Sequence, residues 1–450
     1  MIAFDSPRFK EPEAFQAETL RVYEICNGCR RCFNLCPSFD VLFRGIDDKD
    51  GEVSALDTPV LDQVVDLCYY CKLCFNHCPY CPPHQYDLDF PRLMLWGKHL
   101  KAKRQPAGLR DRLLVDVDQI GRLGGMIAPL ANWALRRSAI RWALEKVMGI
   151  HRERLFPDFH RQSFAAWFHR TRKPAGGEAR RSPVDTQRAE ASERGRLHPA
   201  SPVEGATQAP MMDEKVALFY TCYINRHDPE IGKATLQVLE KNAVEVICPE
   251  QECCGMPYFD IGDLDAVRQK ARSNLKRLTA AVDAGYKIVS PMPTCSLMLK
   301  KEYPDLVPTE EARKVAANTY DLCEYLMKLE GQGKLAKDFV SSPGKIAYQV
   351  PCHLRDQNIG LKSRDLMKLI PGATVEVIER CSGHDGTFGV KKEYYDLSLK
   401  VGRKAFAAVE NAEPDVAVSD CPLSGMALTQ STGKKSVHPI QIIQRAYGFK

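Results

Sequence analysis

Eight of the 18 cysteines stand in two short runs near the N-terminus, and this density points to metal or redox chemistry. The first run has the spacing C-x2-C-x2-C-x3-C, followed by proline, at Cys26, Cys29, Cys32 and Cys36. The second run repeats the spacing and the proline at Cys68, Cys71, Cys74 and Cys78. Such close spacing lets three thiolates hold one face of a metal centre, and the proline then turns the chain away.

The repeated spacing matches bacterial ferredoxins with two [4Fe–4S] clusters, in which the fourth cysteine of each run binds the other cluster. By that rule the first cluster is bound by Cys26, Cys29, Cys32 and Cys78. The second cluster is bound by Cys68, Cys71, Cys74 and Cys36. A pair of structural zinc sites is the alternative, but zinc usually takes two well-separated C-x2-C pairs. We therefore predict two clusters, with Cys81 as a surplus thiol.

The composition agrees with a soluble protein that keeps its thiols reduced. The 450 residues are 44% hydrophobic and 27% charged, which suits two or three globular domains. The N-terminal segment lacks the basic and apolar regions of a signal peptide. No apolar run approaches the roughly 18–20 residues needed to cross a bilayer. We expect a cytoplasmic location, where clustered cysteines serve metal or redox chemistry.

Residues 91–170 are expected to form basic amphipathic helices. The charge comes from Lys101, Lys103, Arg104, Arg110, Arg136, Arg137, Arg141 and Lys146. Helices of this type can lie on anionic lipids, here at the inner face of the cell membrane, or simply pack on their own domain. Packing on the domain is the simpler interpretation, and both stay open. Nucleic-acid binding is not expected, because no recognition motif accompanies the charge. Residues 171–212, poor in large apolar side chains, are expected to form a flexible linker.

The C-terminal half reads as a duplicated unit in which cysteines follow strands. Strands are expected at 215–221, 243–247 and 287–292, with Cys222, Cys253, Cys254 and Cys295 after them. The second copy has strands at 345–350, 374–379 and 415–419, followed by Cys352, Cys381 and Cys421. Long helices are expected at 263–284 and about 391–411. Alternating strands and helices imply parallel sheets, whose carboxyl ends meet at one edge, so each cysteine set should converge.

The two units resemble the cysteine-rich CCG domain, whose pattern is a lone Cys, then Cys-Cys-Gly, then C-x-x-C. That domain occurs in heterodisulfide reductase subunits and in iron–sulfur subunits of glycerol-3-phosphate, glycolate and lactate dehydrogenases. With a ferredoxin module in front, the chain is most similar to iron–sulfur subunits of the anaerobic glycerol-3-phosphate dehydrogenase type. The resemblance implies an α+β multidomain protein and, for complete cysteine sets, clusters that cleave disulfides.

This sequence departs from the CCG pattern in both units. Met292 takes the first position of C-x-x-C in the first unit, where four cysteines remain and could hold a third [4Fe–4S] cluster. Ser382 and Ser424 replace cysteines in the second unit. A cluster there would need a fourth ligand, for which His353 and His384 are the local candidates. An interface role without metal is the preferred interpretation of the second unit.

Three other residues invite simpler interpretations. His384 beside Asp385 could relay a proton, although such a pair is more often a hydrogen bond in a tight turn. Cys248 and Cys323 have no partners in either pattern and are expected to be buried thiols.

We divide the chain into a two-cluster ferredoxin-type domain (1–90), a basic helical region (91–170), the linker (171–212) and two CCG units (213–340 and 341–450). No flavin or nicotinamide fingerprint is evident, so substrate chemistry is expected in a partner. The resemblance implies an electron-transfer role, in which the chain connects a flavoprotein dehydrogenase, or another redox subunit, to quinone or another acceptor. The alternative is a heterodisulfide-reductase-like enzyme that reduces a disulfide or a peroxide-derived substrate at the CCG units. Whether the chain is itself an enzyme stays open.

Overall fold

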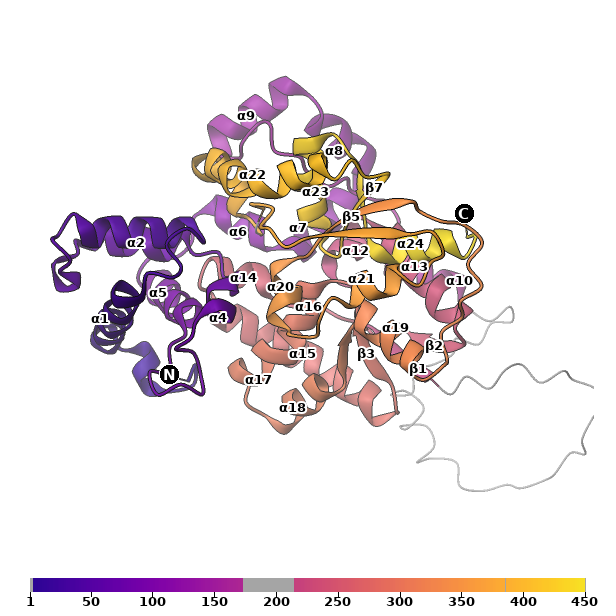
Figure 1. The fold of residues 1–450 in the computed structure, drawn as a ribbon, viewed down its shortest axis with the longest axis horizontal. Helices are drawn as coiled ribbons and strands as arrows, with labels where there is room; N and C mark the ends of the chain where they lie inside the picture. Colours follow the sequence, from indigo (N-terminus) through magenta and orange to yellow (C-terminus); the bar gives the residue numbers. More distant parts are fainter. Residues whose placement is uncertain (1–2, 173–213, 385, 450) are drawn as a thin grey trace, which may run out of the picture.

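The N-terminal module is wholly helical, as predicted. The computed structural model describes residues 3–172, 214–384 and 386–449, so nearly all of the expected linker lies outside the described residues. Figure 1 shows the module at one end of the molecule. Its elements are η1 (Pro7–Lys10), α1 (Pro12–Cys29), α2 (Pro37–Asp47), η2 (Val53–Ala55), α3 (Thr58–Leu67), α4 (Leu73–His77) and α5 (Phe90–Arg104). Proline at an early position starts several of these helices, where its missing N–H has no partner to lose.

The basic region is also helical, but its helices are shorter than the apolar pattern suggests. They are α6 (Leu109–Val115), α7 (Val117–Met126), α8 (Ala128–Leu135), α9 (Ser138–Met148) and α10 (Phe164–Thr171). Asp116 separates the first two helices, because its carboxylate accepts the N–H of Gln119 and so caps α7. Gly149, with φ 63°, ends α9 in the left-handed conformation that glycine adopts without strain.

The first α/β unit is built on a four-stranded parallel sheet. Its strands are β1 (Glu214–Leu218), β2 (Val244–Ile247), β3 (Lys287–Ser290) and β4 (Thr319–Asp321), in the order β2-β1-β3-β4. Its helices are α12 (Cys222–Arg226), α13 (Pro229–Lys241), α14 (Met256–Asp260), α15 (Leu264–Asp283), α16 (Pro293–Leu297), the π-helix η3 (Met298–Glu302), α17 (Tyr303–Leu306), α18 (Glu310–Ala317) and α19 (Leu322–Gly331).

The second unit repeats this topology. Its strands are β5 (Lys345–Gln349), β6 (Thr374–Ile378), β7 (Val416–Ser419) and β8 (Ser436–Val437), in the order β6-β5-β7-β8. Its helices are α20 (Cys352–Asp356), α21 (Lys362–Met367), η4 (Phe388–Val390), η5 (Lys392–Tyr394), α22 (Tyr395–Asn411), α23 (Pro422–Thr432) and α24 (Pro439–Ala446). The predicted α+β architecture with duplicated parallel sheets is thereby confirmed.

The fourth strand of each sheet was not predicted from the sequence. Strand β4 pairs with β3, and β8 pairs with β7, over only two or three residues each. So short a segment has no readable alternation of apolar and polar residues, and only its pairing in the folded sheet defines it. Each fourth strand leads into a helix through a capping box, at Asp321 and at His438.

The N-terminal module and both α/β units share one core. A single cluster of buried apolar side chains runs from Phe4 to Tyr447. The two units also meet directly, because the Nε2–H of His438 donates to the carbonyl oxygen of Pro291 at 2.8 Å. The cysteines of one part of the chain are therefore held at defined positions against those of the others.

Candidate iron–sulfur centres

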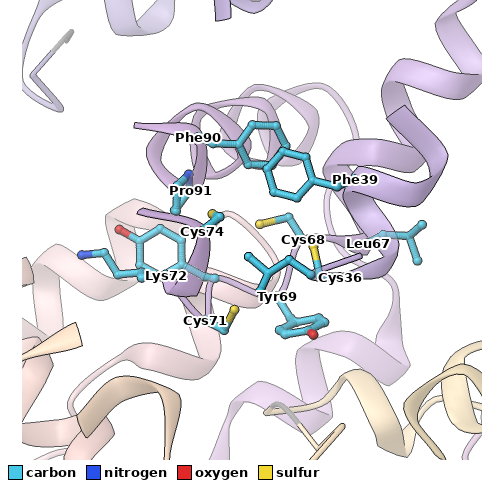
Figure 2. A pocket seen from close by; sticks show the side chains of 12 residues that line it. Cys36, Phe39, Leu67, Cys68, Tyr69, Cys71, Lys72, Cys74, Phe90 and Pro91 are labelled. Atoms are coloured by element: carbon cyan, nitrogen blue, oxygen red, sulfur yellow. The ribbon is translucent and has the colours of Figure 1, made fainter. Parts of the chain in front are cut away.

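Four cysteines from both runs line one cavity in the N-terminal module. They are Cys36, Cys68, Cys71 and Cys74, the set predicted for the second cluster. Figure 2 shows their sulfur atoms turned toward a common space, with Phe39, Leu67 and Phe90 around it. This apolar lining limits the access of water to the space between the thiols.

Local backbone geometry brings these cysteines together. Cys36 is the N-cap of α2, and Cys68 is the C-cap of α3, so the first two thiols lie at facing helix ends. Tyr70 and Lys72 have φ of 55° and 59°, the left-handed conformation that non-glycine residues seldom adopt. These two reversals curl the second run, so that Cys71 and Cys74 reach the same cavity.

Two thiols of this set have raised pKa values, so they ionise less readily than an ordinary cysteine. Burial raises the pKa of Cys36 to about 12, with Cys68 and Cys32 contributing. Burial and the neighbouring thiols raise the pKa of Cys74 well above its ordinary value. Iron reverses this balance, since a metal-bound thiol loses its proton. A buried group of four converging thiols fits an iron–sulfur cluster.

The other four run cysteines form the set predicted for the first cluster; we call them the first group, and the set around the cavity the second group. Burial raises the pKa of Cys26, and Cys32, Cys78 and Cys29 raise it further. Burial likewise raises the pKa of Cys32 to about 11, with Cys78 and Cys29 acting on it. Cys78, from the far end of the second run, thus lies among three thiols of the first run. The crossed ligand sets of two-cluster ferredoxins would require this proximity.

The two groups adjoin one another, and the first lies near the surface. Cys32 acts on the pKa of both Cys36 and Cys74, so thiols of the two groups are close. The chain around Cys78 is exposed at His77 and Pro79. Cys81 does not extend the group; its thiol donates to the carbonyl oxygen of Cys78 at 3.2 Å.

The cavity of the second group faces the second α/β unit. Burial raises the pKa of Cys71 well above its ordinary value, and the next contribution comes from Cys352, with Cys381 also acting. The hydroxyl of Tyr69 lies 3.9 Å from the sulfur of Cys381. Cysteines of the second run and of the second unit therefore lie side by side.

The first α/β unit gathers the four cysteines of its CCG pattern into a third group. The sulfur atoms of Cys254 and Cys295 are 3.4 Å apart, and both side chains are buried. Hydrogen bonds from the thiols of Cys222 and Cys254 lower the pKa of Cys253 well below its ordinary value. At the position of the missing cysteine, the sulfur of Met292 accepts the hydroxyl of Thr221 at 3.3 Å.

Glycine is needed where the Cys-Cys-Gly segment turns. Gly255 has φ 95°, and Gly383, its counterpart in the second unit, has φ 70°. Both values lie in the region that favours glycine. A side chain at Gly383 would also collide with the carbonyl oxygen of Ser398.

The second unit does not repeat the thiol group of the first. The hydroxyl of Ser382 donates to that of Ser424 at 3.1 Å, and both residues are buried. The two serines that replace cysteines are thus hydrogen-bonded to each other. Cys421 acts instead on Tyr223 of the first unit. Burial raises the pKa of Tyr223, and Asp228 and then Cys421 raise it further.

The suggestion that His353 supplies a fourth ligand is wrong. Its Nε2–H donates to the carbonyl oxygen of Tyr70 at 3.1 Å, and its Nδ1 lies 2.9 Å from the hydroxyl of Thr294. Both ring nitrogens are therefore engaged in hydrogen bonds. His384 keeps one buried nitrogen, Nδ1, without a partner among the described residues. Its proposed pairing with Asp385 falls on a residue outside the described ranges.

Two charged residues near these groups escaped the sequence analysis. Asp118 of α7 accepts the backbone N–H of Cys253 at 3.0 Å and the ammonium of Lys270 at 3.1 Å. Lys72 forms a buried ion pair with Glu302. The position of Lys72 inside the second run was a usable signal, whereas Asp118 lies in a region without any motif. Cys248 and Cys323 are buried, as predicted.

Two family models match the chain and cover its cysteine groups. The cysteine-rich domain model named CCG matches residues 216–300 and 346–429. The Fer4-like domain model of citrate utilization protein B matches residues 19–103. The two units and the helical module are therefore the domain types that the motifs predicted.

Relatives agree with these matches. The C subunit of anaerobic glycerol-3-phosphate dehydrogenase from Escherichia coli strain K12 is 25% identical over 342 residues, which cover 75% of this chain and 77% of that protein. Lactate utilization protein A of Geobacillus kaustophilus strain HTA426 is 32% identical over 222 residues, covering 46% of this chain and 87% of that protein. The B subunit of fumarate reductase (CoM/CoB) from Methanothermobacter marburgensis is 27% identical over 247 residues, covering 54% of this chain and 46% of that protein.

The fold and the cysteine groups define an iron–sulfur protein that joins a Fer4-like module to a duplicated CCG domain. Within that class, the chain belongs to the family that contains lactate utilization protein A and the C subunit of anaerobic glycerol-3-phosphate dehydrogenase. The resemblance drawn from the motifs is confirmed. Since two of these relatives are named as subunits of a dehydrogenase and of a reductase, an electron-transfer role beside other redox subunits is supported.

One structural observation bears on association with a membrane. Among the helices of the described ranges, none has the length and apolar character that crossing a bilayer requires.

Proposed function

We propose that this chain relays electrons through two [4Fe–4S] clusters, between a flavoprotein dehydrogenase partner and quinone or another acceptor. One observation carries the proposal: the thiols of the two ferredoxin-type groups lie close together, since Cys32 of the first group acts on the pKa of both Cys36 and Cys74 of the second. Redox centres that adjoin in this way can pass electrons in sequence. The first group, near the surface, suits exchange with a partner.

In this proposal the first cluster is bound by Cys26, Cys29, Cys32 and Cys78, and the second by Cys36, Cys68, Cys71 and Cys74. A third centre is bound by Cys222, Cys253, Cys254 and Cys295. Its support is the contact between the sulfurs of Cys254 and Cys295 and the burial of both side chains. The second CCG unit serves without a metal, because Ser382 and Ser424 satisfy each other.

The alternative function is a reductase of disulfides or peroxide-derived substrates at the first CCG unit. The low pKa of Cys253 favours it, since a thiolate is the form that attacks a disulfide. Burial of Cys253, Cys254 and Cys295 speaks against it, because a substrate must reach them. We therefore place the electron relay first.

We further propose that the basic helical region attaches the protein to a membrane surface. Nine large apolar side chains in the described ranges are at least half exposed, and eight of them lie between residues 109 and 147. These eight are Leu109, Leu123, Met126, Ile127, Leu130, Trp133, Trp142 and Val147. Such a concentration of uncovered apolar surface is unusual on a protein that stays in water.

Exposed cations accompany this apolar surface. They are Arg112, Arg122, Arg136, Arg137 and Lys146. Tryptophan and arginine together favour the boundary of an anionic bilayer. Arg141, from the predicted basic set, is buried, and its guanidinium donates to the carbonyl oxygens of His151, Arg152 and Arg154.

Iron and acid-labile sulfide, measured on anaerobically purified protein together with EPR spectra, test the relay. The proposal expects about twelve irons per chain with the third centre, and about eight if only the ferredoxin-type clusters form. Cys78→Ser should remove the signal of the first cluster and leave that of the second. Cys253→Ala should remove only the third signal. A protein that binds zinc in place of iron contradicts the proposal.

A further inference from the structure

A buried charged network lies behind the cavity of the second cluster. Lys72 stands between Cys71 and Cys74, and its ammonium lies 2.5 Å from a carboxylate oxygen of Glu302. The Lys72 side chain is 11% exposed and that of Glu302 is 1% exposed. A carboxylate oxygen of Asp356, also 1% exposed, lies 3.6 Å from the same ammonium.

The members of this network come from three parts of the chain. Lys72 belongs to the second cysteine run, and the hydroxyl of Tyr70 in that run donates to Glu302 at 3.0 Å. Glu302 ends the π-helix η3, which directly follows the helix that carries Cys295. Asp356 ends α20, the helix that begins at Cys352. The network thus joins the second run to both CCG units, and π-helices often mark functional positions.

Stability alone does not account for such a network. Removing charges from water is expensive, and well-packed apolar residues often replace a buried ion pair without loss of stability. The geometry is that of an ion pair: the Lys72 ammonium lies 2.5 Å from a carboxylate oxygen of Glu302 and 3.6 Å from one of Asp356. The pKa of Glu302 is lowered although burial opposes this, because Lys72 attracts its charge and Lys72 and Tyr70 donate to it.

The position of the pair relates it to the cluster. Lys72 lines the same cavity as Cys71 and Cys74. In Figure 2 the Lys72 nitrogen points away from the sulfur atoms, toward the outside of the cavity. Fixed charges interact more strongly in surroundings of low polarity than in water. The net charge near a cluster is one determinant of its reduction potential.

We propose that Lys72 and Glu302 form a fixed charge pair that sets the reduction potential of the second cluster, with both as positioning residues. The inference rests on the proposed function, because it requires a cluster at Cys36, Cys68, Cys71 and Cys74. The ammonium favours the reduced cluster, which carries one more negative charge. The carboxylate disfavours it. Removing one partner therefore shifts the potential in a direction that depends on which partner is removed.

Redox titration of the full-length protein, followed by EPR of the second cluster, tests this pair. Glu302→Gln keeps the side-chain shape and removes the carboxylate, so the ratio of reduced to oxidised cluster at one fixed potential should rise about tenfold. A tenfold change corresponds to about 59 mV for a one-electron couple. Lys72→Met should lower the same ratio. The double variant should return close to the wild-type ratio, because the two effects cancel.

An exposed ion pair of the same module is the matched control. Lys101 and Asp66 are 2.7 Å apart and 45% and 37% exposed, so water screens them, and Asp66→Asn should leave the ratio unchanged. The proposal is overturned if Glu302→Gln lowers the ratio, leaves it unchanged or loses the second cluster while the first remains. If the Lys72→Met variant does not hold the second cluster, the ratio of reduced to oxidised cluster in Glu302→Gln tests the proposal by itself. A wild-type protein without a second cluster would instead refute the proposed function.

Discussion

Each group of four thiols in the N-terminal module combines three cysteines of one run with the fourth cysteine of the other. Cys78 lies among three cysteines of the first run, and Cys36 lines the cavity of the second. This grouping could be predicted from spacing, because the fourth position of each run follows a turn that leads to its neighbour. The charged residues beside the thiols could not be predicted. Glu302 belongs to none of the motifs, and only the fold brings it to Lys72.

Restoring cysteines to the second CCG unit should create a cluster site there. Ser382→Cys with Ser424→Cys gives this unit the complete pattern with Cys352, Cys381 and Cys421. The two hydroxyls already face each other at 3.1 Å, so thiols placed there would point at the same space. We expect the iron content to rise by up to about four per chain, with a new EPR signal.

The single variants are the control for this gain. Ser382→Cys and Ser424→Cys taken separately should add less iron than the pair, because an incomplete set holds a cluster weakly. Unchanged iron in the double variant would mean that the remaining three cysteines do not converge on the serine pair.

Among the elements, long periodic segments were easier to predict than short ones. The helix expected at 263–284 is α15, Leu264–Asp283, and the strands expected in both units are present. Strands β4 and β8 were missed, because two or three residues carry no periodic pattern. The basic segment divides into short helices at Asp116 and near Arg137, since local caps and turns interrupt an apolar pattern that runs on.

We expect the exposed tryptophans on helices α8 and α9 to be needed for binding to anionic membranes. Trp133→Glu with Trp142→Glu replaces two half-exposed apolar side chains by charges that anionic lipids repel. We expect cosedimentation with vesicles containing phosphatidylserine, at low salt, to fall at least severalfold. The free energy of unfolding should change little, because neither tryptophan is buried.

Val340→Glu is the matched control for this experiment. Val340 is 73% exposed, but it lies outside the basic helical region. Its replacement should leave vesicle binding unchanged. If wild-type protein stays in the supernatant with these vesicles, the membrane proposal is wrong, and the apolar surface has another partner.

At the scale of the whole molecule, the two CCG units meet across a buried pair of carboxyl groups. Asp321 ends β4, Asp420 follows β7, and both are at most 2% exposed. Oxygen atoms of the two lie within 4.8 Å of one another and of the Cys323 sulfur. Burial and the charge of Asp420 raise the pKa of Asp321 to about 8.

This pair makes stability depend on pH. Between about pH 4 and pH 8 the folded protein keeps a proton on Asp321 that the unfolded chain has released, so the free energy of unfolding falls as pH rises. Asp321→Asn keeps a capping side chain and cannot ionise. We expect it to be more stable than the wild type at pH 8, on the order of 2 kcal/mol, with a smaller difference at pH 5.

Denaturant midpoints at the two pH values measure this difference. Asp263→Asn is the matched control, since Asp263 also caps a helix, α15, by accepting the N–H of Ala266. If the stability of Asp263→Asn relative to the wild type rises with pH as much as that of Asp321→Asn, the pH dependence comes from the change in the helix cap. The facing carboxyl group of Asp420 would then not be its cause.

The single core has a consequence for how electrons move. One cluster of buried side chains extends from Phe4 in the N-terminal module to Tyr447 in the second CCG unit. A module packed in this way is not a swinging arm that carries charge from one site to another. In the proposed relay this packing would hold the centres at fixed separations, and any large motion that limits the rate would belong to the partner.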